Sequence, residues 1–121
     1  MLSRTIAVLK KLDAAPEKAL PTRDLLRITD FSRSELFRIF MGLEHAGVVS
    51  QTRLTFLGDV QGYRLKKNLS EISLLTVMDA VDTCAELWSV TGLKSTEGYR
   101  AYRSAVEACR KELSGIYLTQ F

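Results

Sequence analysis

The chain has few prolines, few cysteines, one histidine and no long hydrophobic run. Its two prolines and seven glycines among 121 residues exclude a collagenous or disordered chain. The only apolar block near the N-terminus, residues 6–9, is broken by Lys10 and Lys11, so it is too short for a signal-peptide core or a membrane span. We therefore expect a folded cytoplasmic protein with no membrane partner.

The cysteine and histidine pattern indicates neither a metal site nor catalysis. Cys84 and Cys109 stand 25 residues apart without CxxC spacing, which favours two reduced, buried thiols over a zinc site or a disulfide scaffold. His45 is the only histidine, and no metal-ligating partner accompanies it. An enzyme is the least favoured class because there is no glycine-rich phosphate loop and no nucleophile beside a base.

Length and charge predict one main domain with a basic surface. A chain of this size can bury one core but has no room for two full domains. Residues 1–70 have 12 Lys and Arg against 7 Asp and Glu, whereas residues 71–121 have 5 against 7. Since a basic half favours contact with phosphates, we expect a nucleic-acid-binding domain over residues 1–90 and a C-terminal helix with a tail over residues 91–121.

Apolar residues at helical spacing predict two helices before residue 30. The first spans residues 3–14 and is ended by Pro16. The second is only about two turns long, and Thr22 is its expected N-cap. Leu25, Leu26 and Ile28 are expected on its apolar side.

The strongest local signal is a capping box at the start of a third helix. In Ser32-Arg33-Ser34-Glu35, the Ser32 side chain caps the Glu35 amide while Glu35 returns to the Ser32 amide. This helix is expected to run to about His45, and Gly47 supplies the left-handed residue that ends it. Joined to the preceding helix by a short turn, it makes a helix-turn-helix. The residues expected to face inward are Leu36, Ile39, Phe40 and Leu43.

Beyond Gly47 the hydrophobic period changes to two, which predicts a β-hairpin that turns at Gly58 and Asp59. Alternation in its second strand sends Tyr63 and Leu65 to one face, and Arg64 and Lys66 to the other. A cationic face of this kind suits a wing that lies along phosphates. The fold class is therefore a winged helix-turn-helix, mainly α with a small β-hairpin.

The amino end of the second helix of a helix-turn-helix reaches base edges in the major groove. Arg33 and Arg38 are therefore expected to contact guanine, and Ser34 to bond phosphate or base. Core packing is the expected role of Phe37, and contact with thymine methyl groups is the alternative. The full set of expected DNA contacts is Thr22, Ser32, Arg33, Ser34, Arg38, Arg53, Gly62, Arg64, Lys66 and Lys67.

The C-terminal part of the chain carries a heptad stripe. After a fourth helix capped by Ser73, apolar residues recur at intervals of three and four from residue 99 to residue 116. This stripe either packs back on its own domain or forms the seam of a homodimer, and we expect the homodimer. Its members are Tyr99, Tyr102, Val106, Cys109, Leu113 and Ile116.

Three segments resemble the Rrf-two family of bacterial winged-helix regulators, which includes IscR, NsrR and CymR. They are Phe-Ser-Arg-Ser-Glu-Leu at 31–36, Leu-Glu-His-Ala-Gly-Val-Val-Ser at 43–50, and Gly-Tyr-Arg-Leu at 62–65 followed by Glu-Ile-Ser-Leu-Leu at 71–75. The resemblance covers about residues 3–88. It implies a dimer with a long C-terminal dimerisation helix, an operator of dyad symmetry and, usually, repression.

The chain departs from the family pattern at three places. Gln61 replaces the first glycine of the Gly-Gly that normally precedes the wing tyrosine, and Phe37 stands where a polar residue is common. Cluster-binding members carry three closely spaced cysteines before the dimerisation helix, where this chain has only Cys84. We therefore expect no iron-sulfur cluster and no other cofactor. A thiol switch at Cys84 or Cys109 stays open as an alternative.

Together these patterns predict a sequence-specific regulator of transcription that binds double-stranded DNA as a homodimer and acts as a repressor. The alternative is a winged-helix module that binds a protein partner without binding DNA, because winged helices do both. No residue pattern identifies the operator or an effector.

Overall fold

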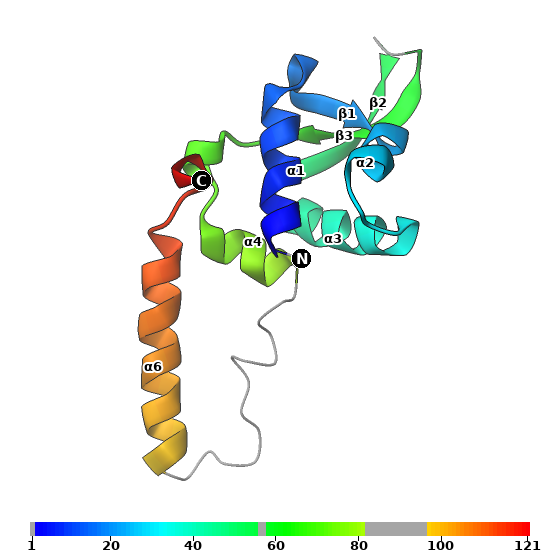
Figure 1. Ribbon diagram of the computed structural model, residues 1–121. Coiled ribbons are helices and arrows are strands. Elements are labelled where there is room, and N and C mark those ends of the chain that lie inside the picture. Colours follow the sequence, from blue (N-terminus) through cyan, green and yellow to red (C-terminus); the bar gives the residue numbers. More distant parts are fainter. Residues whose placement is uncertain (1, 56–57, 82–96) are drawn as a thin grey trace.

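The computed structural model describes residues 2–55, 58–81 and 97–121. Its fold is a winged helix, mainly helical with a small antiparallel sheet, as the sequence predicts (Figure 1). The principal elements in chain order are α1 (Leu2–Ala14), β1 (Ala19–Pro21), α2 (Thr22–Ile28), α3 (Arg33–His45), β2 (Val49–Leu54), β3 (Val60–Leu65), α4 (Leu74–Ala80) and α6 (Glu97–Ser114).

The sheet contains one strand that the sequence does not predict. The strand order is β1-β3-β2, so β3 lies at the centre and pairs antiparallel with both neighbours. Tyr63 of β3 stands opposite Leu20 of β1 on one side and Gln51 of β2 on the other. β1 has only three residues, too few to show a hydrophobic alternation, and its pairing with β3 is what makes it a strand.

The core lies between α1, α3 and the sheet. From α1, Leu9 and Leu12 are fully buried and Ile6 nearly so. α1 crosses the middle of the molecule, with the sheet above α3 in the view of Figure 1. A single hydrophobic cluster therefore contains residues of α1, of α3 and of the sheet.

The last residues of the chain also belong to this core. Leu118 is fully buried, and its backbone N–H donates to the Ile72 carbonyl at 3.0 Å. The Leu74 N–H donates to the Ile116 carbonyl at 2.7 Å, next to an isolated bridge between Ser73 and Tyr117. Residues 116–121 therefore pack on the domain at the start of α4, whereas the sequence places them in a separate C-terminal unit.

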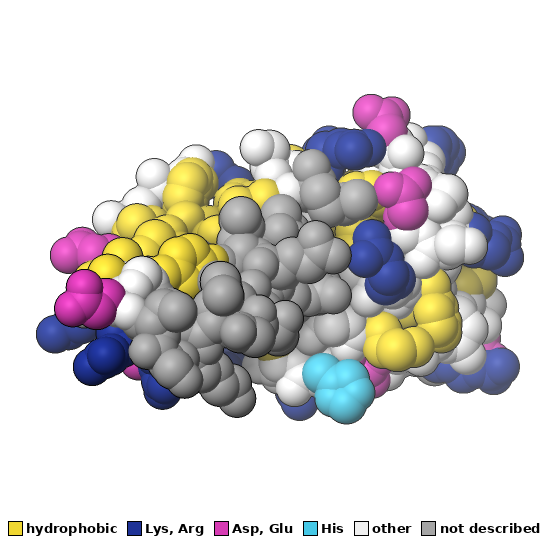
Figure 2. Space-filling view, turned by 90° about the horizontal axis from the view of Figure 1, so that it is seen from below, with side chains coloured by type: hydrophobic (Ala, Val, Ile, Leu, Met, Phe, Trp, Pro, Cys, Tyr) yellow, Lys and Arg dark blue, Asp and Glu magenta, His cyan; other side chains and the backbone are white. Residues whose placement is uncertain are grey.

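Helix α6 projects from this body (Figure 1), and the described apolar side chains of its stripe are only partly buried. Tyr102, Val106 and Leu113 are half-buried. Seen from below, hydrophobic side chains gather at the end of the molecule that carries α6 (Figure 2). A bidentate ion pair joins α6 to α4, because Nη1 and Nη2 of Arg110 contact the two carboxylate oxygens of Asp79 at 3.1 and 3.0 Å.

The stripe differs from the prediction at two of its positions. Helix α6 ends at Ser114, so Ile116 lies beyond the helix, where its backbone turns back to meet α4. Cys109 is exposed, which corrects the expectation of a buried thiol at this position. Two other predictions fall outside the described residues, namely the side chain of Tyr99 and the location of Cys84.

Helix α2 corrects two further predictions. The N-cap is Pro21, and Thr22 is the first helical residue, with no capping bond from a side chain. Pro21 takes the cap position because it is held in an extended conformation, opposite Gly62 in the β1–β3 pair. Ile28, expected on the apolar side of α2, is 39% exposed. The Ser73 cap of α4 is confirmed, since its hydroxyl accepts from the Thr76 N–H at 3.1 Å.

Candidate nucleic-acid interface

The amino end of α3 is fixed by the predicted capping box. The Ser32 hydroxyl accepts from the Glu35 N–H at 3.1 Å, and the Glu35 carboxylate accepts from the Ser32 N–H at 3.1 Å. The hydrogen bonds from the Ser32 backbone and side chain, with smaller contributions from the Arg4 and Arg38 charges, hold the pKa of Glu35 below its ordinary value. The two backbone N–H groups, which the helix itself leaves unpaired, thus both have hydrogen-bond partners. The first turn of α3 therefore has a defined position.

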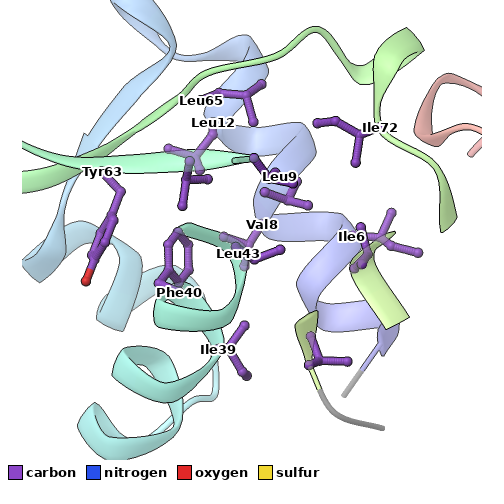
Figure 3. Packing of buried hydrophobic residues seen from close by; sticks show 14 of the residues in the cluster. Ile6, Val8, Leu9, Leu12, Ile39, Phe40, Leu43, Tyr63, Leu65 and Ile72 are labelled. Atoms are coloured by element: carbon purple, nitrogen blue, oxygen red, sulfur yellow. The ribbon is translucent and has the colours of Figure 1, made fainter. Parts of the chain in front are cut away.

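The inner side of α3 is locked against the sheet and against α4. Leu36, Ile39, Phe40 and Leu43 are all at least 98% buried, as predicted. The rings of Phe40 and Tyr63 pack with centroids 4.6 Å apart and planes tilted by 44° (Figure 3). Burial, followed by the Glu44 carboxylate, raises the pKa of Tyr63. At Gly42 an added Cβ would collide with the backbone of Ala80, so glycine permits the close contact between α3 and α4.

The outer side of α3 combines cations with exposed apolar side chains. Phe37 is 53% exposed and Met41 is 48% exposed, so the prediction that Phe37 packs in the core is wrong. Its neighbour Leu36 fills the inward position, and the next residue along a helix points about 100° away. A shallow hollow on this side is lined by Arg33, Ser34, Phe37, Arg38 and Met41.

This outer side of α3 faces the underside of the molecule. In Figure 2 hydrophobic side chains lie close to His45, with Lys and Arg side chains near them. Among the residues that the structure describes, no carboxylate lines the hollow, and the only acidic residue in the first turn of α3, Glu35, is tied to Ser32. The exposed side of α3 is therefore cationic at the edges of this hollow and apolar between them, whereas Glu44 is exposed nearer the carboxyl end of the helix, where it lines a second hollow with Met41 and His45.

Both arginines of the wing lie beside carboxylates that were not predicted as their partners. Arg64 lies on the face of β3 opposite Tyr63, as predicted, and contacts Glu17 at 3.1 Å. Arg53 contacts Asp59 at 3.1 Å across the hairpin. The Arg53–Asp59 pair could have been anticipated from the two strands flanking a tight turn, but Glu17 lies 47 residues from Arg64, and no local pattern links them.

Lys66 and Lys67 are exposed just beyond the end of β3. The backbone N–H of Lys66 donates to the Val48 carbonyl at 2.8 Å, which fixes the chain at this point while leaving both ammonium groups in solvent. Thr22 is half-buried at the start of α2. Thr22, Lys66 and Lys67 therefore lie at the edge of the domain and not on the outer side of α3.

Gly62 does not belong among the exposed candidates. It is buried, and a Cβ added there would lie 2.7 Å from Cδ1 of Leu54, 2.9 Å from Cα of Pro21, and closer still to the Leu20 carbonyl oxygen. Only glycine allows β1 to approach β3 at this point. We therefore correct its predicted role from DNA contact to strand packing.

Two further observations bear on other kinds of function. Within residues 2–55, 58–81 and 97–121, no three His, Cys, Asp or Glu side chains gather as a metal site would require. None of the helices in the described part of the chain combines the length and apolar character needed to cross a lipid bilayer.

No family model and no curated protein sequence matches this chain. Solved structures do match it. Oxidised CymR of Staphylococcus aureus superimposes with a TM-score of 0.65 at 18% identity, covering 97% of this chain and 85% of CymR. CymR of B. subtilis, named as its global cysteine regulator, superimposes with a TM-score of 0.66 at 16% identity, covering 97% of this chain and 88% of that one. A crystal structure provisionally described as a DNA-binding protein superimposes with a TM-score of 0.69 at 19% identity, covering 98% of this chain and 95% of that one. The chain therefore has, over nearly all its length, the winged-helix fold of CymR.

Proposed function

We propose that this protein binds double-stranded DNA sequence-specifically as a homodimer and regulates transcription as a repressor, in the cytoplasm and without a membrane partner. The observation that carries the proposal is the outer side of α3. Arg33, Ser34 and Arg38 stand exposed on the second helix of a helix-turn-helix, close to its capped amino end. Of the described residues that line the hollow there, none is a carboxylate.

The chemistry of this helix side matches the major groove. The groove admits one α-helix, and an arginine can donate two hydrogen bonds to the O6 and N7 atoms of guanine. Ser32 and Ser34 can donate to phosphate or base from the same turn. Because the inner side of α3 is locked by Phe40 and its neighbours, these groups are held in place before DNA binds.

The remaining cations suit phosphate contacts, which position a protein on DNA without reading sequence. Lys66 and Lys67 are exposed at the base of the wing, and Thr22 stands at the amino end of α2. Arg53 and Arg64 are paired with Asp59 and Glu17 in the free protein. These exposed ion pairs contribute little stability, so phosphates can compete for both guanidinium groups.

The apolar stripe of α6 supports the homodimer. Tyr102, Val106 and Leu113 lie on one side of a projecting helix and keep part of their surface exposed in a single chain. A two-fold seam along this side would cover them and place two copies of α3 on an operator of dyad symmetry. The regulatory role stated in the name of B. subtilis CymR, whose fold this chain has, agrees with the proposal.

One observation favours a second candidate, a winged-helix module that binds a protein partner. Phe37 and Met41 are both about half exposed on the same helix side, and exposed apolar pairs of this kind also occur at protein interfaces. The two candidates differ in the expected effect of removing a cation. Loss of Arg33 would alter the sequence preference of a DNA-binding protein. In a module that binds only a protein partner, the same loss would have no effect on DNA binding.

The test is a fluorescence-anisotropy titration of a duplex taken from upstream of the protein's own gene, with excess competitor DNA and a series of salt concentrations. We expect saturable binding of one dimer per site, weakening steeply with salt because bound counterions are released. If neither this duplex nor unrelated DNA binds at low salt, the DNA-binding proposal is wrong.

Substitutions sharpen this test. Arg33→Ala should weaken binding to the preferred site about 5- to 150-fold and relax specificity at one position, as expected for loss of a bidentate guanine contact. Arg64→Ala should weaken binding to all sequences and reduce the salt slope by about one. Lys111→Ala is the charge-matched control, since Lys111 is exposed on α6 on the side opposite its apolar stripe. It should leave both properties unchanged.

A further inference from the structure

Phe37 and Met41 form an exposed apolar pair on α3, and the DNA contacts proposed for the arginines do not explain why these two side chains are apolar. Phe37 and Met41 are four residues apart, so they stand one above the other on the same side of the helix. They are 53% and 48% exposed, respectively, although both side chains are large and apolar. Each gains free energy only when a binding partner removes its surface from water.

The residues around this pair define what can occupy the hollow. Arg33 and Arg38 line it together with Ser34, and none of the lining residues that the structure describes is acidic. An occupant that fits must therefore bring negative charge at its edges and an apolar group between the charges. The major groove supplies both, because phosphates flank it and the C5-methyl group of thymine is the only apolar group on the base edges there.

We infer that Phe37 and Met41 contact thymine methyl groups, and that the preferred site of this protein therefore contains A·T pairs beside the guanines contacted by Arg33 and Arg38. This inference rests on the proposed DNA-binding function and adds a specificity-determining contact to it. Phe37 is the main contributor, since it lies one turn closer than Met41 to the amino end that enters the groove. Apolar contact and hydrogen bonding then act side by side on one helix face.

The experiment begins by selecting the tightest-binding duplexes from a randomised pool with the wild-type protein. Each thymine of the selected site is then replaced, one at a time, by deoxyuridine, which removes only the methyl group. We expect a loss of about three- to tenfold in affinity at one or two positions per half-site, the size expected for withdrawing one methyl group from an apolar contact. The remaining positions should show no change.

Variants assign this effect to the side chain. In Phe37→Ala the thymine and deoxyuridine duplexes should bind equally at the affected position, whereas in Arg33→Ala their affinity ratio should stay at the wild-type value. Phe121→Ala is a matched control, because Phe121 is 52% exposed and lies on the C-terminal segment. That variant should keep both the affinity and the deoxyuridine effect of the wild type.

Three outcomes would overturn the inference. Deoxyuridine could bind like thymine at every position, or the loss could persist unchanged in Phe37→Ala; in both cases the inference is wrong while DNA binding stands. If no duplex is enriched from the pool, the inference and the proposed function both fail. The apolar pair would then be assigned to a protein interface.

Discussion

Helices α3 and α6 are both amphipathic, but they bury their apolar sides to very different extents. The inward residues of α3 are at least 98% buried within one chain, and its outer side adds a smaller apolar pair between two arginines. The stripe of α6 is only half-buried, although the helix is longer. A helix needs an apolar partner for its stripe. α3 finds this partner in its own domain, whereas the stripe of α6 is only partly covered, and we propose that a second copy covers the rest.

The difference follows from how each helix is attached. α3 lies below the sheet and packs on β3 through Phe40 and Tyr63, while Gly42 admits α4 against its other side. α6 meets the described part of the domain through α4, where Arg110 pairs with Asp79, and through the segment that carries Leu118 into the core. The amino-terminal part of α6 projects away from these contacts (Figure 1).

The largest expected effect separates the two sides of α3. Phe40→Ala should lower the free energy of unfolding by about 3–5 kcal/mol, because it removes a fully buried ring and leaves a cavity. Phe37→Ala should change it by less than about 0.5 kcal/mol, since that ring is half in solvent. Urea unfolding of both variants measures this contrast. Equal losses of unfolding free energy would contradict the difference in burial between the two sides of α3.

The next effect concerns α6. Val106→Glu should weaken self-association about 100-fold, because a two-fold seam would bury the new carboxylate twice without a partner. Ser104→Glu adds the same charge on the exposed side of α6 and should leave self-association unchanged. Sedimentation equilibrium measures both variants, with circular dichroism to confirm that the helices are intact. A dimer that survives Val106→Glu would place the seam elsewhere.

The smallest effect is the pH dependence of the α3 cap. Because the pKa of Glu35 is lowered in the folded protein, its stabilising contribution is complete above its ordinary value of 4.5 and is lost as the pH falls through the folded value. Wild type should therefore lose more stability than Glu35→Gln on going from pH 6 to pH 3. Thermal unfolding at the two pH values gives this difference. Parallel losses in both proteins would mean that the carboxylate does not stabilise the cap.

Sequence patterns located the interface helix but not the role of each residue on it. The capping box at Ser32 and Glu35 gave the start of α3 to the residue, and the left-handed Gly47, with a φ of 76°, gave its end. The same periodicity identified Phe40 as buried but misassigned Phe37. Two adjacent hydrophobic residues, Leu36 and Phe37, compete for one inward position, and the neighbouring elements decide between them.

The sequence by itself determined what short stretches of chain specify. Caps, turn glycines and hydrophobic periods act within a few residues, so they defined α1, α3, the hairpin and the start of α4. Only the tertiary structure decided the features that depend on distant residues. Strand β1 exists because β3 pairs with it, Leu118 is buried because it reaches Ile72, and Glu17 meets Arg64 across 47 residues. Such contacts leave no local pattern, since their free energy depends on which surfaces the fold brings together.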